Sequence, residues 1–312
     1  MNNCAFVFPG QGSQTVGMLA DLAYKNKIIL ETFNEANSVL NYSLWDIVQL
    51  GPSEKLNETI YTQVAMLVAD VALFRLINNL TRVEISLMAG HSLGEYAALV
   101  CAGALSLPDA TSLVQKRAEL MQQHVPLGLG AMAAIVGLED ESVKQLCQEV
   151  SDANYKVMPA NYNAIGQVVV AGHTEAVYKL IKAAETKNAR LAKLIPVSVP
   201  CHCELLEKAA TEFNTVLHAT QFKEPSFAIL SNVDALAYIS PSDIRTRLTQ
   251  QLYSPVQWVA IIQAMADKGI TKIVECGPGQ VLSGLIKRID RSITTYNTNS
   301  EDALTRIKRD GE

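Results

Sequence analysis

The sequence has few charged residues, few glycines and prolines, and few cysteines, and each shortage excludes a class of protein. Of its 312 residues, 18% are charged and 49% hydrophobic, which is too apolar for a disordered chain. The 17 glycines and 11 prolines are too few for a collagen-like or low-complexity sequence. The six cysteines are scattered along a long chain, which excludes a small disulfide scaffold and favours reduced thiols.

The sequence also lacks an excess of positive charge and an uninterrupted apolar run. With 26 basic and 31 acidic residues, its net charge is −5, so no basic footprint for nucleic acid covers the whole domain. The longest apolar stretch, residues 64–77, contains Asp70 and Arg75 and is shorter than the ~20 residues of a membrane span. The N-terminus shows no signal-peptide pattern. We therefore expect a soluble, cytoplasmic protein without a nucleic-acid or membrane partner.

Length and residue patterning predict an α/β protein with two domains. At about 150 residues per domain, the length suggests two. Strand and helix patterns alternate over residues 1–124 and 198–312, which is typical of a mostly parallel sheet covered on both faces. Residues 125–197 follow the order β-α-β-β-α-β, the ferredoxin-like motif. We expect this second unit to be a subdomain inserted into the first.

The segment Gly90-His91-Ser92-Leu93-Gly94 fits the G-x-S-x-G pattern of a nucleophile elbow. It follows a predicted strand at 85–89 and precedes a predicted helix at 95–102, which is the context that the elbow requires. The tight turn would lift the Ser92 hydroxyl above the sheet edge, where the N-terminus of the helix favours negative charge. The Leu93 N–H is then a natural oxyanion donor. The alternative is a βα turn in which Ser92 only caps the helix.

A serine nucleophile needs a base, and His202 is the best placed of the five histidines. It precedes a predicted helix at 204–219, where the carboxyl edge of a sheet would display it. It also follows the serine in chain order, as in α/β-hydrolases. His91 adjoins the nucleophile, so its side chain is expected to point away. The remaining histidines are expected to be solvated, capping or loop residues: His124, His173 and His218.

The other motifs carry weaker signals. No Asp or Glu stands out near the elbow as a third triad member, although a backbone or amide carbonyl is able to hold the histidine tautomer instead. Cys201-His202-Cys203 lacks further ligands at zinc-site spacing, so no metal is expected. Residues 9–15 resemble a dinucleotide fingerprint, but Thr15 stands where the third glycine belongs. We interpret this loop as one that presents Gln11 near a strand end.

Several segments together resemble the malonyl-CoA:acyl carrier protein transacylase family of fatty acid synthesis. They occur in one order over nearly the whole chain, and jointly they are far more specific than any one alone. The matching segments are Phe8 to Gln14, Gly90 to Glu95, Arg117 to Met121, Gly130 to Met132, Asn161 to Gly166, Pro200 to Cys203 and Glu275 to Gly279. The resemblance implies an α/β-hydrolase-like large domain that carries a ferredoxin-like small one.

The resemblance also implies the roles of the site residues. Ser92 would be the acylated nucleophile and His202 its base. The main-chain carbonyl of Gln251 would orient the histidine in place of a carboxylate, which answers the question of the missing acid. The N–H groups of Leu93 and Gln11 would form the oxyanion hole.

Arg117 would hold the free carboxylate of the malonyl group. A planar guanidinium that stays charged when buried suits this task. Without the resemblance, a surface residue paired with Glu119 is the more ordinary interpretation. Cys201 departs from the family, whose bacterial members usually have serine before the histidine. Because Cys and Ser are similar in size, we expect malonyl selectivity to persist.

The activity that the resemblance implies is ping-pong transfer from malonyl-CoA to the phosphopantetheine thiol of acyl carrier protein. It implies no cofactor beyond these substrates, and a monomer. Three rivals remain from the sequence: a serine hydrolase such as a thioesterase, a non-catalytic carrier-binding protein, and a dinucleotide-dependent oxidoreductase. Acyl carrier proteins are acidic, and basic residues beside the cleft would steer them; ordinary solvated surface is the alternative. The candidates are Lys187, Arg190, Lys193, Lys287 and Arg288.

Overall fold

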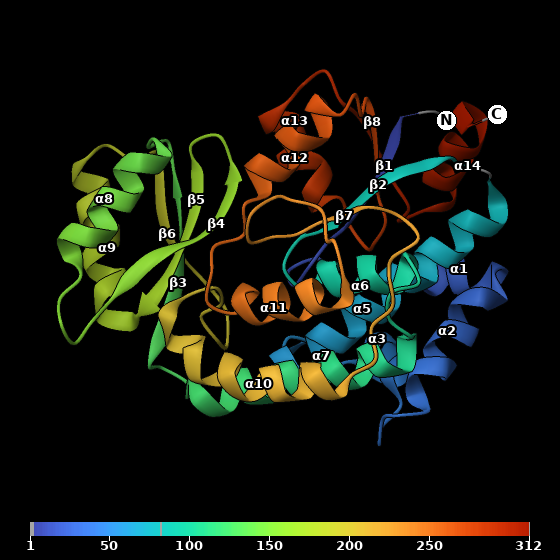
Figure 1. The fold of residues 1–312 in the computed structure, drawn as a ribbon, viewed down its shortest axis with the longest axis horizontal. Coiled ribbons are helices and arrows are strands. Elements are labelled where there is room, and N and C mark those ends of the chain that lie inside the picture. The colour runs from blue at the N-terminus through green and yellow to red at the C-terminus, as the bar shows by residue number, and fades with distance from the viewer. Residues whose placement is uncertain (1–2, 82, 312) are drawn as a thin grey trace.

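The computed structural model describes residues 3–81 and 83–311 and contains two sheets of different kinds. The larger sheet is parallel throughout. Figure 1 shows the two sheets in separate units, with the smaller unit on the left. In sheet order, the parallel strands are β7 (Ile229–Leu230), β2 (Ile85–Gly90), β1 (Cys4–Phe8), β8 (Lys272–Glu275) and β9 (Thr294–Asn297). The predicted mixed α/β class with a parallel sheet is confirmed.

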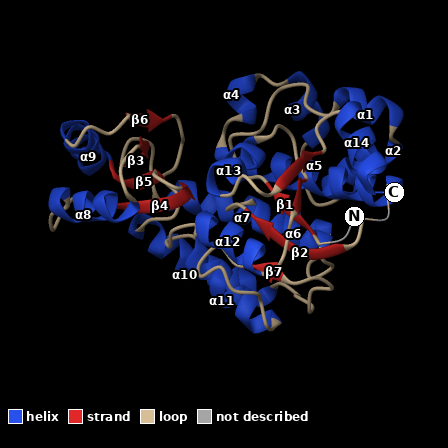
Figure 2. Cartoon of the chain, turned by 90° about the horizontal axis from the view of Figure 1, so that it is seen from above, coloured by secondary structure: helices blue, strands red, loops and turns tan. Residues whose placement is uncertain are grey.

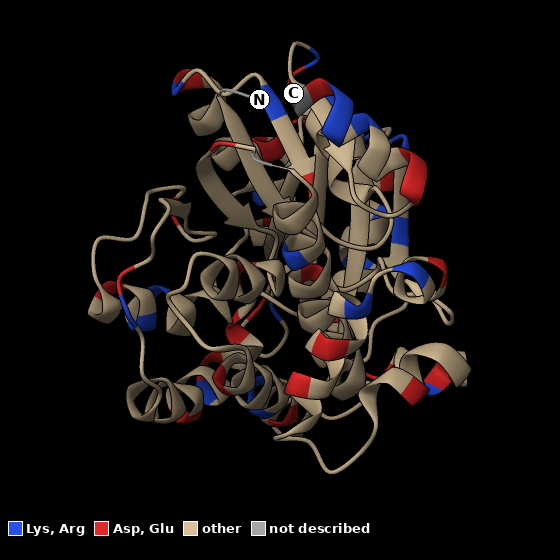
Figure 3. Cartoon of the chain, turned by 90° about the vertical axis from the view of Figure 1, so that its right-hand side faces the viewer, with Lys and Arg blue, Asp and Glu red and all other residues tan. Residues whose placement is uncertain are grey.

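Helices cover both faces of the parallel sheet, because successive side chains of a buried strand point to opposite sides. In β1, Cys4, Phe6 and Phe8 join one hydrophobic cluster, whereas Ala5 and Val7 join another. Figure 3 shows that Lys, Arg, Asp and Glu lie mainly on helices and loops, and that the central strands are largely uncharged. The first cluster includes α2 (Lys27–Asn37), α5 (Thr59–Leu80), α6 (Gly94–Cys101), α7 (Leu107–His124) and α10 (Glu207–Ala219), and the second α12 (Trp258–Asp267) and α13 (Val281–Ile289).

Helix α5 contains the apolar stretch at 64–77 and extends beyond it at both ends. By length and composition alone it could cross a membrane, but 83% of its most apolar window is buried inside the structure. The two charged residues do not interrupt it. Asp70 is buried in the core, and Arg75 pairs with Glu35 at 2.6 Å. Helix α5 therefore packs as a core helix.

Several elements differ from the sequence-based prediction. The apolar run at 227–231 indicates a strand, but only the two residues of β7 form one, and the predicted helix at 204–219 divides into η1 (Glu204–Leu206) and α10. Three helices were not predicted: α3 (Leu44–Leu50), α4 (Ser53–Leu56) and α14 (Glu301–Gly311). Among the α14 residues whose burial is described, 301–310, Leu304 and Ile307 are the buried ones, and two positions are too few for a detectable pattern. The sequence patterns at 16–24 and 241–252 indicate helices, and the structure has α1 (Ala20–Lys25) and α11 (Pro241–Gln251) there.

The smaller unit has the element order predicted for it. Its antiparallel sheet has the strand order β4-β5-β3-β6. Helices α8 and α9 cover one face and, as Figure 2 shows, lie on the side away from the larger unit. The opposite face packs against Cys203 and Leu205 of the larger unit. The elements are β3 (Gly130–Val136), α8 (Asp140–Val150), β4 (Val157–Ala164), β5 (Gln167–His173), α9 (Thr174–Thr186) and β6 (Leu191–Ile195).

Strand β4 joins the two units. The Tyr162 N–H donates to the Val256 carbonyl at 2.9 Å, and the Val256 N–H donates to the Ala160 carbonyl at 2.9 Å. Asn163, on the same strand, lies 2.7 Å from Nε2 of His91 in the elbow. The smaller unit is thus fixed beside the carboxyl edge of the parallel sheet.

Candidate active site

The predicted elbow is present between β2 and α6. Ser92 has a φ of 51°, a strained value for a residue with a side chain. Both flanking glycines are required by close contact. A Cβ on Gly90 would lie 1.9 Å from the carbonyl carbon of Gly94, and a Cβ on Gly94 would lie 2.0 Å from the Phe8 carbonyl oxygen. The chain can make this turn only with glycine at both positions.

Ser92, His202 and Gln251 form a continuous hydrogen-bonded chain. Ser92 Oγ lies 2.7 Å from His202 Nε2, and His202 Nδ1 lies 2.7 Å from the main-chain oxygen of Gln251. Because a carbonyl can only accept, Nδ1 carries the proton and Nε2 faces the serine hydroxyl as an acceptor. Burial, followed by the nearby Arg117 charge, lowers the pKa of His202 to about 3. The imidazole is therefore neutral and ready to accept a proton.

Arg117 lies in the same buried network. Its side chain is only 1% exposed. Nη1 donates to Gln63 Oε1 at 2.7 Å, and Nη2 donates to Gln251 Oε1 at 3.1 Å. Glu119 pairs instead with Lys116 at 3.3 Å, so a surface pairing of Arg117 with Glu119 is excluded. A buried cation held by amide oxygens is suited to bind an anion.

The loop after β1 passes directly beside the elbow. A Cβ on Gly10 would lie 2.7 Å from the His91 carbonyl oxygen and 3.7 Å from the Leu93 nitrogen. The Gln11 side chain donates to Thr59 Oγ1 at 2.9 Å, which fixes the loop to α5. Over residues 3–81 and 83–311, neither the Gln11 N–H nor the Leu93 N–H donates to another protein group. Both are thus available to a ligand at the elbow.

The other histidines and the Cys203 thiol take no part in the hydrogen bonds that join Ser92, His202, Gln251 and Arg117. The His91 side chain points away from the Ser92 hydroxyl, as predicted, toward Asn163. Its ring packs edge-on against Trp258, with 5.3 Å between the ring centroids. Burial raises the pKa of the Cys203 thiol to about 12, which disfavours a thiolate ligand. Among the described residues, no group of three or more His, Cys, Asp or Glu is arranged to hold a metal ion. His124 instead pairs with Glu212, and His173 accepts from the Lys156 N–H.

Comparison with known proteins identifies the family to which this site belongs. The acyl transferase domain family matches residues 5–312. The malonyl CoA-acyl carrier protein transacylase of Escherichia coli (strain K12) is 47% identical over 304 residues, covering 97% of this chain and 98% of the relative. The chain belongs to the acyl transferase family.

Solved acyl transferase structures have the same fold. The malonyl CoA-acyl carrier protein transacylase of Coxiella burnetii is 44% identical, with a TM-score of 0.97 over 99% of this chain and 97% of that one. A malonyl-transacylase in complex with a type II polyketide synthase acyl-carrier protein is also 44% identical. Its TM-score is 0.96 over 98% of this chain and 99% of that one.

The acyl transferase site contains two polar residues that the sequence analysis missed. Asn232 Oδ1 accepts from the Ser92 N–H at 2.6 Å, and Glu95 Oε2 accepts from the Gln251 side chain at 2.5 Å. Glu95 is the last residue of the matched segment that begins at Gly90. An acidic residue in an Ala-rich helix was a usable signal of burial with partners. Asn232 gave none, because it follows a strand of only two residues and lies 140 positions from Ser92.

Proposed function

We propose that the chain transfers a malonyl group from malonyl-CoA to the phosphopantetheine thiol of acyl carrier protein, in fatty acid synthesis. The observation that carries the proposal is the chain of contacts from Ser92 through His202 to Gln251, with buried Arg117 attached to the same glutamine. Full-length relatives named for malonyl-CoA and acyl carrier protein support these substrates. The enzyme uses no cofactor of its own.

The first half-reaction acylates the serine. His202 Nε2 takes the Ser92 proton as Oγ attacks the thioester carbonyl, and the N–H groups of Leu93 and Gln11 receive the developing oxyanion. Each such donor is worth about 3–4 kcal/mol in known cases. Collapse of the tetrahedral intermediate breaks the carbon–sulfur bond, and the His202 proton leaves with the CoA thiol. The product is a malonyl-serine ester.

The second half-reaction reverses these steps with a different thiol. The phosphopantetheine thiol gives its proton to His202 and attacks the ester carbonyl. The same oxyanion donors stabilise the second intermediate, and Ser92 leaves with the proton from His202. One base thus serves both halves, as a ping-pong mechanism requires.

Arg117 is proposed to select the substrate. Its guanidinium would exchange one or both amide contacts for the malonyl carboxylate, a stronger charge-assisted partner. Acetyl groups offer no such partner, so the pair would both select malonyl and orient the ester. Cys201 stands where the family usually has serine. Burial raises the pKa of its thiol, and the nearby Arg117 charge opposes part of this rise.

We assign residues 1–124 and 198–312 to an α/β-hydrolase-like catalytic domain and residues 125–197 to a ferredoxin-like subdomain. The elbow between a parallel strand and a helix supports the first assignment. The β-α-β-β-α-β order and the β4-β5-β3-β6 sheet support the second.

We further propose that the enzyme acts as a cytoplasmic monomer and meets its carrier through basic surface residues. The position of Arg288 supports a carrier contact beside the cleft. Its Nη1 donates to Gln167 Oε1 of the small unit at 2.5 Å, so Arg288 lies where the units meet. The other candidates are exposed: Lys187, Arg190, Lys193 and Lys287. The burial of α5 favours a protein without a membrane span.

The main rival is a serine hydrolase, which would use the same elbow with water as the acceptor. A product assay separates the two. The enzyme is mixed with malonyl-CoA and holo acyl carrier protein, and both malonyl-carrier and free malonate are measured. A transferase forms malonyl-carrier in proportion to the CoA released. Free malonate as the main product would overturn the proposal in favour of hydrolysis, and absence of both products would favour a non-catalytic carrier-binding protein.

A further inference from the structure

We propose that Glu95 is a positioning residue for acyl transfer, which acts on His202 through the side chain of Gln251 and on Ser92 through Asn232. The inference rests on the proposed function of the same site. A serine-histidine pair ordinarily has a carboxylate bound directly to the histidine. Here the Glu95 carboxylate binds Gln251, and Gln251 binds the histidine.

The Glu95 carboxylate is buried and fully engaged. Its side chain is 0% exposed. Oε1 accepts from the Asn232 N–H at 3.0 Å and from the Tyr238 hydroxyl at 2.6 Å, and Oε2 accepts from Gln251 Nε2 at 2.5 Å. All three partners donate, which matches an ionised carboxylate, a group that can only accept.

Gln251 converts this contact into control of the base. Its Nε2 donates both to Glu95 and to the Ser92 carbonyl, the latter at 2.9 Å, while its Oε1 accepts from Arg117. Because two acceptors face Nε2 and a cationic donor faces Oε1, the amide can take only one orientation. The same residue presents its main-chain carbonyl to His202. Glu95 therefore holds the residue that sets the histidine tautomer.

A second branch runs from Glu95 to the nucleophile. The Asn232 N–H is bound by Glu95, and the Asn232 side chain in turn holds the elbow. Its Oδ1 accepts from the Ser92 N–H at 2.6 Å, and its Nδ2 donates to the Gly90 carbonyl at 2.6 Å. These bonds fix the strained turn, whose φ at Ser92 is 51°. One carboxylate thus connects to both reacting side chains.

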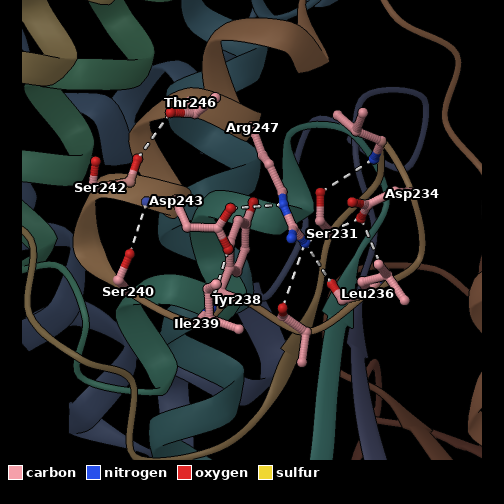
Figure 4. Close-up of polar contacts among 12 residues, drawn as sticks. Ser231, Asp234, Leu236, Tyr238, Ile239, Ser240, Ser242, Asp243, Thr246 and Arg247 are labelled. Carbon is pink, nitrogen blue, oxygen red and sulfur yellow. Dashed lines mark hydrogen bonds and ion pairs between the residues drawn. The ribbon is translucent and has the colours of Figure 1, made fainter.

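The loop that carries Tyr238 is itself tied down. Figure 4 shows Arg247 at its centre, with Asp234 on one side and Asp243 on the other. Arg247 contacts Asp234 at 3.1 Å and Asp243 at 2.9 Å, and also donates to the Leu236 carbonyl at 3.1 Å. The Tyr238 hydroxyl is therefore presented to Glu95 by an ordered loop.

The charges around Glu95 give the proposal a distinct pH signature. Burial raises the pKa of Glu95 to about 7, against the lowering effect of its bonds to Tyr238, Gln251 and Asn232 and of the Arg117 charge. The other titratable groups facing it stay in one form near neutral pH. Burial holds the pKa values of Tyr238 and Tyr96 above their ordinary range and lowers that of His202 to about 3.

Protonation of the Glu95 carboxylate would weaken the hydrogen bonds that it accepts. Protonated Oε2 would face the Gln251 amide donor, so this hydrogen bond would be lost and the glutamine released. The rate of serine acylation should therefore fall as the pH drops through about 7. The His202 imidazole would produce such a fall only at much lower pH. The acid limb of the pH profile is assigned to Glu95.

The test is the pre-steady-state rate of malonyl-enzyme formation, followed by intact-protein mass between pH 5.5 and 8.5. For Glu95→Gln we expect a maximal rate lower by about 10²-fold, the cost of a small misplacement of catalytic groups, with little change in KM and no acid limb near pH 7. Tyr238→Phe removes a bond that lowers the Glu95 pKa, so its acid limb should move to higher pH. Glu119→Gln, an exposed member of a surface pair, is the matched control and should behave as wild type.

Three results would overturn the proposal: a Glu95→Gln rate within about twofold of wild type, persistence of its acid limb, or an unmoved limb in Tyr238→Phe. The last measurement decides the question even if Glu95→Gln fails to fold. If the wild-type enzyme forms no adduct, the proposed function fails instead. The two failures are thus distinguishable.

Discussion

Ser92 Oγ lies 2.7 Å from His202 Nε2, although 110 positions separate the two residues in the sequence. Both residues have positive φ values, 51° and 61°, in a region that residues with side chains rarely occupy. The surrounding packing must hold both against this strain. The contact therefore depends on groups that take no part in the chemistry.

The glycines of the elbow provide the first test of this dependence. In Gly94→Ala, the new methyl group would lie 2.0 Å from the Phe8 carbonyl oxygen. We expect a loss of about 1–3 kcal/mol in the free energy of unfolding together with loss of the malonyl adduct. Gly284→Ala in α13 is the control, because its Cβ would meet nothing within 4 Å and should add about 0.4–1 kcal/mol. Urea unfolding measures both, and a Gly94→Ala protein as stable as wild type would refute the steric account.

Arg117 should determine the choice of acyl group. Arg117→Ala removes the partner for the malonyl carboxylate, so kcat/KM for malonyl-CoA should fall by about 10²-fold or more, as loss of charge-assisted hydrogen bonds implies. The activity with acetyl-CoA, which has no such carboxylate, should fall much less, so that the preference for malonyl is lost. Lys116→Ala, at the adjacent exposed position, should leave both activities unchanged. Retention of the malonyl preference by Arg117→Ala would remove the proposed role.

Burial of His202 should make the fold sensitive to acid. Burial lowers the pKa of His202 from its ordinary value of 6.5 to about 3, so the folded state binds fewer protons than the unfolded state between these pH values. The contribution of this group to stability is thus present above pH 6.5 and is lost as the pH falls below it, by about 1.4 kcal/mol between pH 7.5 and 5.5. Relative to wild type, His202→Gln should gain this amount over the same interval. A stability difference that does not change with pH would contradict the prediction.

Salt should affect the two half-reactions differently. Acyl carrier proteins are acidic, so the exposed basic residues proposed to meet the carrier should speed their association, an effect that added salt screens. We expect Lys193→Glu to lower kcat/KM for the carrier by about tenfold at low salt and to leave acylation by malonyl-CoA unchanged. Lys144→Glu, on α8 of the same unit, is the control. Carrier transfer that is independent of salt would count against steering.

Local sequence signals were enough to predict the elbow and most of the elements. Gly90 and Gly94 flank Ser92 because no larger residue fits, and a steric requirement of this kind is visible in the sequence itself. The β-α-β-β-α-β order of the smaller unit was likewise readable, because each of its elements has its own apolar periodicity.

What the sequence did not reveal depends on contacts between distant segments. Asn232 reaches Ser92 across 140 positions, and Gln251 reaches Glu95 across 156. No local pattern distinguishes such an asparagine or glutamine from one in solvent. The role of Gln251 was available only from the family resemblance, since a main-chain carbonyl has no residue signature. Glu95 directly follows the elbow in the sequence, but its contact with the histidine is indirect, through Gln251, and no local pattern shows such a contact.

The central claim is that Ser92 carries the malonyl group between two thiols. Intact-protein mass spectrometry after brief mixing with malonyl-CoA tests it directly, for wild type and Ser92→Ala, followed by addition of holo acyl carrier protein. The account predicts a malonyl adduct on wild type alone, which the carrier then discharges as malonyl-carrier. An adduct that persists in Ser92→Ala, or a wild-type enzyme that never forms one, would contradict it.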